Sequence, residues 1–200
     1  MMYTLGRSLV AFPIMRILCR FKVEGVEHIP QKGGFILASN HASYLDPLAL
    51  GVACPRKLSF MAKEELFRNP LFARVLKQVG AFPVRRESAD TSALKEAIRR
   101  VRSGKALVLF PEGERKASGA PDKEPQAGVG FLAQKSGVPV IPAFIDGTQR
   151  ALPRGARIIR PARILVRFGT QVAIEEKMPY PDAASLIMKG IRQLQKEISS

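Results

Sequence analysis

The fold is decided by residues 35–46, which read FILASNHASYLD. The run from Phe35 to Ala38 is short and continuously apolar, a pattern typical of a strand buried on both faces. Asn40 and His41 follow it almost at once, so the sequence places a histidine at the end of a buried strand. Functional residues of parallel α/β sheets gather at such strand ends, which makes residues 40–46 the first candidate site.

Similar apolar runs recur along the chain and alternate with helical patterns. Strands are predicted at residues 35–38, 58–61, 106–110, 138–145 and 164–168. Helices are predicted around residues 94–101, ended by Gly104, around 131–133, and around 187–198, with Asp182 as the cap. This alternation predicts an α/β fold with a mostly parallel central sheet covered by helices.

Length and composition indicate one basic, well-packed domain. The chain has 200 residues, of which 46% are hydrophobic, and its formal net charge is +15. Such a charge attracts nucleic acid, anionic lipid or phosphorylated substrates without choosing among them. Cys19 and Cys54 are the only cysteines and His28 and His41 the only histidines. Neither a disulfide framework nor a metal site is expected, and a reducing compartment fits.

Residues 1–21 form an amphipathic segment in which Pro13 separates two apolar faces. The uncharged run between Arg7 and Arg16 is far shorter than the roughly 20 residues of a spanning helix, so we expect no transmembrane segment and no secretory signal. Two short helices are predicted here. They either dock on the domain or lie in a bilayer interface as a membrane hook.

His41 and Asp46 are the candidate catalytic pair. A neutral imidazole accepts a proton near pH 7, and a nearby carboxylate can hold its other nitrogen in the required tautomer. The alternative is that Asp46 only caps a helix beside an incidental histidine. Since no serine or cysteine with a recognisable nucleophile motif accompanies the pair, direct activation of a substrate hydroxyl is favoured over a covalent intermediate.

A second candidate site is the loop at residues 110–116, which reads FPEGERK and follows another buried strand. Arg115 and Lys116 are suited to hold a phosphate, although a solvated loop would have the same composition. Two further segments accompany it. Residues 80–86, GAFPVRR, are predicted to form a strand that ends in paired arginines, and residues 138–142, VPVIP, form an apolar strand interrupted by prolines.

Four segments, taken together in their order along the chain, resemble the lysophosphatidic acid acyltransferase family, the bacterial 1-acylglycerol-3-phosphate acyltransferase type. They are residues 40–46, 80–86, 110–116 and 138–142. The likeness runs from about Val23 to Gly169. It implies that His41 is the general base, that Asp46 orients it, and that the acceptor phosphate is bound by Glu112, Gly113, Arg115 and Arg85. It also implies acyl transfer from coenzyme A or acyl carrier protein to lysophosphatidic acid, without a cofactor, in a catalytic domain spanning residues 22–200.

The chain departs from the family pattern beside the expected phosphate loop. Glu114 stands where the family usually has threonine, and Lys116 where it usually has serine. An extra carboxylate next to a phosphate site keeps the acceptor open, with glycerol 3-phosphate or another lysolipid as the alternatives.

Six arginines, at positions 150, 154, 157, 160, 163 and 167, lie in a stretch from Gly147 to Ile174 that contains no acid. They form a solvated face, or contact an anionic bilayer or the phosphates of coenzyme A. We expect a peripheral protein on the cytoplasmic side of the membrane.

Two competing functions from other classes can be weighed on the sequence. A basic nucleic-acid-binding module is disfavoured by the 7% aromatic content and the absence of Trp and of known binding motifs. A catalytically silent lipid-binding relative is disfavoured by the intact His41 and Asp46.

Overall fold

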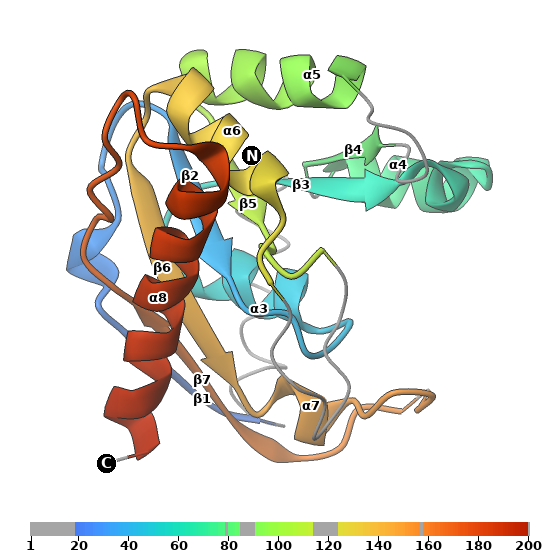
Figure 1. The fold of residues 1–200 in the computed structure, drawn as a ribbon. Helices are drawn as coiled ribbons and strands as arrows, with labels where there is room; N and C mark the ends of the chain where they lie inside the picture. The colour runs from blue at the N-terminus through green and yellow to red at the C-terminus, as the bar shows by residue number, and fades with distance from the viewer. Residues whose placement is uncertain (1–18, 79, 85–90, 114–123, 157, 200) are drawn as a thin grey trace.

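The computed structural model describes residues 19–78, 80–84, 91–113, 124–156 and 158–199. Within them lies one seven-stranded sheet in the order β1-β7-β6-β2-β5-β3-β4 (Figure 1). The strands are β1 Cys19–Glu24, β2 Phe35–Ser39, β3 Leu58–Lys63, β4 Ala81–Val84, β5 Ala106–Leu109, β6 Val140–Asp146 and β7 Ala162–Phe168. All neighbouring pairs are parallel except β6 and β7. The predicted α/β fold with a mostly parallel, helix-covered sheet is confirmed.

Helices cover both faces of this sheet. They are α3 Asp46–Ala53, α4 Pro70–Gln78, α5 Thr91–Arg102, α6 Ala127–Ser136, α7 Thr148–Ala151 and α8 Tyr180–Ser199, with short 3-10 turns η2 Val26–His28 and η3 Glu64–Phe67. No helix among the described residues is both long and apolar enough to cross a membrane.

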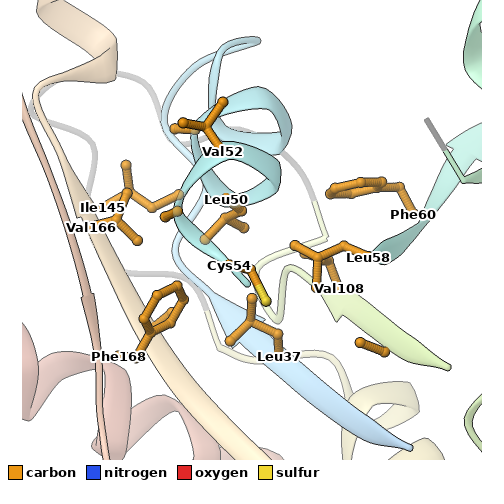
Figure 2. Packing of buried hydrophobic residues seen from close by; sticks show 14 of the residues in the cluster. Leu37, Leu50, Val52, Cys54, Leu58, Phe60, Val108, Ile145, Val166 and Phe168 are labelled. Carbon is orange, nitrogen blue, oxygen red and sulfur yellow. The ribbon is translucent and has the colours of Figure 1, made fainter. Parts of the chain in front are cut away.

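The central strand β2 shows why the apolar run at residues 35–38 forms a strand. Its five residues are all buried, and alternate side chains enter two different cores. Leu37 lies in the core on the α3 face of the sheet, together with Leu50 of α3 and Val108 of β5 (Figure 2). Ile36 packs on the opposite face, in the core that α5, α6 and α8 cover. Both cores are therefore built on one sheet, and β2 lies in the middle of each.

The strand directions bring several loops to one edge of the sheet. In a parallel sheet the carboxyl ends of β2 and β5 lie together, and β6 ends at the same edge because it runs parallel to β2. Since β7 is antiparallel to β6, the beginnings of β7 and of its parallel partner β1 also lie there. We call this the active edge, because the candidate base His41 lies two residues beyond Ser39, the last residue of β2.

The structure corrects the sequence expectation at two helix boundaries. Residues 19–21, expected to close a helical segment, belong to β1, because alternate residues of CRFKVE turn toward the core and the strand pairs with β7. Residues 1–18, the rest of the predicted hook, lie outside the described residues. Helix α8 begins at Tyr180, so Asp182 lies in its first turn instead of capping it.

Candidate active site

His41 is held at the active edge by its backbone and by the face of its ring. Its backbone N–H donates to Oε2 of Glu112 over 3.2 Å. Its imidazole stacks on the ring of Phe110, with centroids 4.0 Å apart and planes 19° apart. Phe110 and Glu112 follow β5, the strand next to β2 in the sheet. The two neighbouring strand ends thus position one histidine.

His41 and Asp46 form a hydrogen-bonded pair. Nδ1 of His41 donates to Oδ2 of Asp46 over 2.8 Å, and the side chains are 14% and 0% exposed, respectively. An ionised carboxylate only accepts, so Nδ1 carries the hydrogen and Nε2 keeps its lone pair when the ring is neutral. The arrangement can therefore take a proton from a group that approaches Nε2.

The alternative reading of Asp46 as a simple helix cap is wrong. The cap position of α3 is Leu45, Asp46 is the first helical residue, and no side chain caps the helix. The carboxylate instead turns back to the preceding loop, where Oδ2 accepts the backbone N–H groups of Ala42 and Ser43 over 2.7 and 2.8 Å.

Thr148 is a site residue that sequence reasoning missed. Its hydroxyl, on the first residue of α7, donates to Oδ1 of Asp46 over 2.5 Å, and the residue is fully buried. Both carboxylate oxygens of Asp46 are thereby hydrogen-bonded, which offsets the cost of burying a charge. Thr148 lies 102 residues from Asp46 in the chain. No local spacing connects two residues so far apart.

The end of β6 and the residue that follows α7 support the loop carrying His41 at two further points. The side-chain amide of Asn40 donates to the carbonyl of Ile145 and accepts from its N–H, both over 2.8 Å. The Ser43 hydroxyl donates to the carbonyl of Leu152 over 3.0 Å. Asn40 and Ser43 therefore tie the loop that holds His41 to the end of β6 and to α7.

Glu112 and Gly113 occupy the tight turn after β5. Glu112 is 7% exposed, and its carboxylate receives the His41 backbone N–H. Gly113 has a φ of 72°, and a Cβ there would lie 2.0 Å from Nε2 of Gln126, so a side chain at this position would be strained and would displace Gln126. The structure thus brings Glu112 into contact with His41, a neighbourhood that the expected phosphate site had not suggested.

Three of the expected phosphate-loop positions, Arg115, Glu114 and Lys116, lie outside the described residues, as does Arg85, which follows β4. The role of Arg85 and Arg115 therefore stays a prediction. In the part of the chain that the structure covers, no group of three or more His, Cys, Asp or Glu side chains is arranged to hold a metal ion.

The fold and this edge define a class: an α/β protein in which a strand-end histidine, oriented by a buried aspartate, is available as a base. A model of the Acyltransferase family matches residues 20–146, more than half of the chain. The chain belongs to the Acyltransferase family, and the resemblance seen in the sequence is confirmed.

Named relatives agree with this assignment. A 1-acyl-sn-glycerol-3-phosphate acyltransferase of Bacillus subtilis is 35% identical over 127 residues, 63% of this chain and 62% of the relative. The enzyme of that name from Streptococcus pneumoniae is 30% identical over 179 residues, 88% of this chain and 64% of the relative. The matches thus span less than two thirds of either curated relative.

A solved structure is similar over nearly the whole chain. The 1-acyl-sn-glycerophosphate (LPA) acyltransferase PlsC of Thermotoga maritima superposes with a TM-score of 0.73 at 25% identity, covering 96% of this chain and 82% of that one.

Proposed function

We propose that this chain transfers a fatty acyl group from an acyl thioester to the free hydroxyl of lysophosphatidic acid, giving phosphatidic acid. The observation that carries the proposal is the His41–Asp46 pair, in which Nδ1 is bonded over 2.8 Å and Nε2 keeps its lone pair. The names of the two bacterial relatives and of the Thermotoga maritima structure support this acceptor.

The chemistry follows from general-base catalysis. Nε2 of His41 takes the proton of the acceptor hydroxyl as the oxygen bonds to the thioester carbonyl carbon. The carbon–sulfur bond then breaks, the ester remains on the acceptor, and the leaving thiolate takes up a proton to become a thiol. Asp46 holds the imidazole in the tautomer that makes Nε2 the base and stabilises the imidazolium that forms.

The acceptor phosphate is assigned to Glu112, Gly113, Arg115 and Arg85 on the strength of the family motif. An arginine offers two parallel donors to a phosphate, a contact worth about 1.5 to 3 kcal/mol for a charged group. Arg115→Ala should therefore raise the KM for lysophosphatidic acid by about tenfold or more and leave the KM for the thioester nearly unchanged. An equal rise in both constants would contradict the assignment.

The reaction is proposed to take place at the cytoplasmic surface of a membrane, where a lipid acceptor and product reside. Coenzyme A and acyl carrier protein are both candidate carriers of the acyl group. Because Glu114 adds a carboxylate to the sequence of the expected phosphate loop, other acceptors must be compared with lysophosphatidic acid. These are glycerol 3-phosphate and lysolipids of other kinds.

One assay tests the proposal. The purified protein is incubated with a labelled acyl thioester on each carrier and with lysophosphatidic acid, glycerol 3-phosphate or lysophosphatidylcholine, and the lipid products are separated. Phosphatidic acid is the expected product, absent with His41→Ala. Failure to form it with either carrier would refute the proposal, and acylation of glycerol 3-phosphate alone would favour the alternative acceptor.

A further inference from the structure

A loop between α7 and β7 projects from the active edge of the molecule. It comprises residues 152–161, of which the structure describes 152–156 and 158–161, and is here called the α7–β7 loop. Its described residues extend away from the body of the sheet in Figure 1. Its base is closed, because the backbone N–H of Arg160 donates to the carbonyl of Ala151 over 2.8 Å. A turn nearer the tip is held by the N–H of Ala156 and the carbonyl of Pro153, 3.0 Å apart.

This loop exposes two adjacent isoleucines. Ile158 is 78% exposed and Ile159 is 36% exposed, whereas Leu152 at the base packs on the core. Ile158 is the most exposed of the large apolar side chains of the described residues. A single exposed aliphatic residue is ordinary, but a pair on a projecting loop offers apolar surface to a partner.

The arginines around the loop divide into two groups. Arg150 pairs with Asp146 over 2.6 Å, and Arg167 pairs with Glu24 over 2.6 Å, so their charges are already matched. Arg154, Arg160 and Arg163 are exposed and form no ion pair with any residue that the structure describes. Three exposed cations without a carboxylate partner among the described residues thus lie on either side of the isoleucines in the chain.

The position of the loop relates it to the site and to the start of the chain. Pro161 leads directly into β7, whose first residue Ala162 is the register partner of Cys19 at the start of β1. Arg163 is likewise the partner of Arg20, another exposed arginine. The loop, the point where residues 1–18 join the sheet, and His41 therefore lie along one edge.

We propose that the α7–β7 loop docks on an anionic lipid bilayer, with Ile158 and Ile159 entering the headgroup region and Arg154, Arg160 and Arg163 contacting lipid phosphates. An apolar tip flanked by unmatched cations is complementary to an anionic bilayer, which offers an apolar layer beneath negative charge. A soluble acyl thioester also combines phosphate with an apolar chain, but its acyl carbonyl must reach His41, whereas the isoleucines lie on a loop that extends away from the sheet. The inference deepens the proposed function by turning the active edge toward the membrane that holds the acceptor.

The absence of tryptophan from the chain allows a direct test. In the full chain, Ile158→Trp introduces a single tryptophan at the loop tip, which can be excited selectively over the tyrosines. Val26→Trp is the matched control, because Val26 is an exposed aliphatic residue, 37% exposed, in η2 at the opposite edge. Vesicles of phosphatidylcholine mixed with phosphatidylglycerol should shift the emission of the first variant to the blue, and brominated acyl chains should quench it, with no such change in the control. An unshifted tryptophan at position 158, or an equal shift at position 26, would overturn the proposal.

The contribution of the arginines to membrane binding is tested by two double variants, each of which removes two positive charges. Arg154→Gln with Arg160→Gln should lower the partition coefficient on the anionic vesicles by about tenfold and change it little on pure phosphatidylcholine, as expected for cations at an anionic surface. Lys189→Gln with Lys196→Gln removes two exposed charges from α8 and should lower binding less than twofold. Equal losses from the two pairs would mean that only net charge matters, which contradicts a specific loop.

Turnover on a soluble short-chain lysophosphatidic acid separates this inference from the proposed function. The loop variants should keep wild-type kcat and thioester KM in that assay while losing vesicle binding. A raised thioester KM with normal vesicle binding would identify the loop as a donor site instead and overturn the docking proposal. If the wild type makes no phosphatidic acid but the loop variants still lose vesicle binding, the proposed reaction fails and the docking surface stands.

Discussion

Asp46 is the residue on which the candidate site depends. Its fully buried carboxylate accepts hydrogen bonds from the His41 ring, two backbone N–H groups and the Thr148 hydroxyl. A carboxylate so fully bonded is fixed in one rotamer, and it fixes the orientation of the imidazole in turn. Both residues therefore matter for geometry as well as for charge.

Replacing the base tests the chemistry directly. His41→Ala should lower kcat by about 10²- to 10⁴-fold, the usual contribution of a general base. His28→Ala is the matched control, because His28 is the only other histidine and its ring bonds the Phe168 carbonyl at the opposite edge. Steady-state kinetics of the two proteins, with circular dichroism to verify folding, make the comparison. Equal activity of both variants would remove His41 from the mechanism.

Thr148 should act through Asp46 without touching substrate. Thr148→Val keeps the shape of the side chain and leaves Oδ1 of Asp46 buried without its donor, which costs about 1 to 3 kcal/mol. We expect kcat to fall by about tenfold, with KM values nearly unchanged, and Thr148→Ser to restore most of it because the hydroxyl returns. A loss of stability with full kcat in the valine variant would show that the contact is structural only.

The sequence predicted His41 and Asp46 because their spacing lies within one loop, where a strand end and a five-residue separation are visible. Thr148 could not be predicted in this way, since only the pairing of β2 with β6 brings it near. Glu112 was expected at a phosphate, yet it also holds the His41 backbone, a contact that depends on the neighbouring positions of β2 and β5.

At the level of helices and strands, the spacing of apolar residues predicted secondary structure best in a long helix. The residues at 187, 191, 194 and 198 predicted α8, and the apolar runs predicted five strands of the sheet. The strand β1 was mistaken in part for a helix, because in so short a segment its alternating apolar residues also fit a helical face. Its pairing with β7, about 140 residues later, decides the conformation.

Helix α5 carries a charge cluster whose effect on stability depends on pH. Glu96 accepts hydrogen bonds from Arg99 and Arg100, and the bond from Arg99 above all lowers the pKa of Glu96 from 4.5 to about 2. A carboxyl whose pKa is lowered by folding stabilises the protein above its unfolded pKa, and this stabilisation is lost as the pH falls toward the folded value. The contribution is therefore complete at pH 7 and declines between about pH 4.5 and pH 2.

Glu96→Gln should lower the free energy of unfolding by about 0.5 to 1 kcal/mol at pH 7, the scale of two exposed helical pairs. The difference from wild type should shrink at pH 4 and further at pH 3, as measured by urea denaturation. Glu176→Gln is the control, since Glu176 is exposed and forms no ion pair with any other described residue. A difference independent of pH would exclude the ion pairs as its source.

For the whole molecule, the central feature is that the sheet has a separate hydrophobic core on each face. The candidate site lies on the side of only one of these cores. The loop carrying His41, together with α3 and α7, belongs to the face on which Leu37 packs, while α5, α6 and α8 cover the other face. The alternation of strand and helix patterns along the sequence predicted a sheet covered by helices. It did not predict which helices share a face of the sheet. Strand order sets that division, and the strand order depends on pairings between distant segments.

This division predicts that stability and turnover respond differently on the two faces. Ile187→Ala in α8 and Leu50→Ala in α3 each remove a fully buried side chain, and each should lower the free energy of unfolding by about 2 to 5 kcal/mol. Below the unfolding temperature, Ile187→Ala should retain wild-type kcat, because α8 packs on the face away from Asp46. Leu50→Ala should lower kcat several-fold, because a cavity under α3 lets the helix that begins with Asp46 shift. Denaturation curves and kinetics on both proteins test this, and equal kcat values would show that the pair is held by its hydrogen bonds alone.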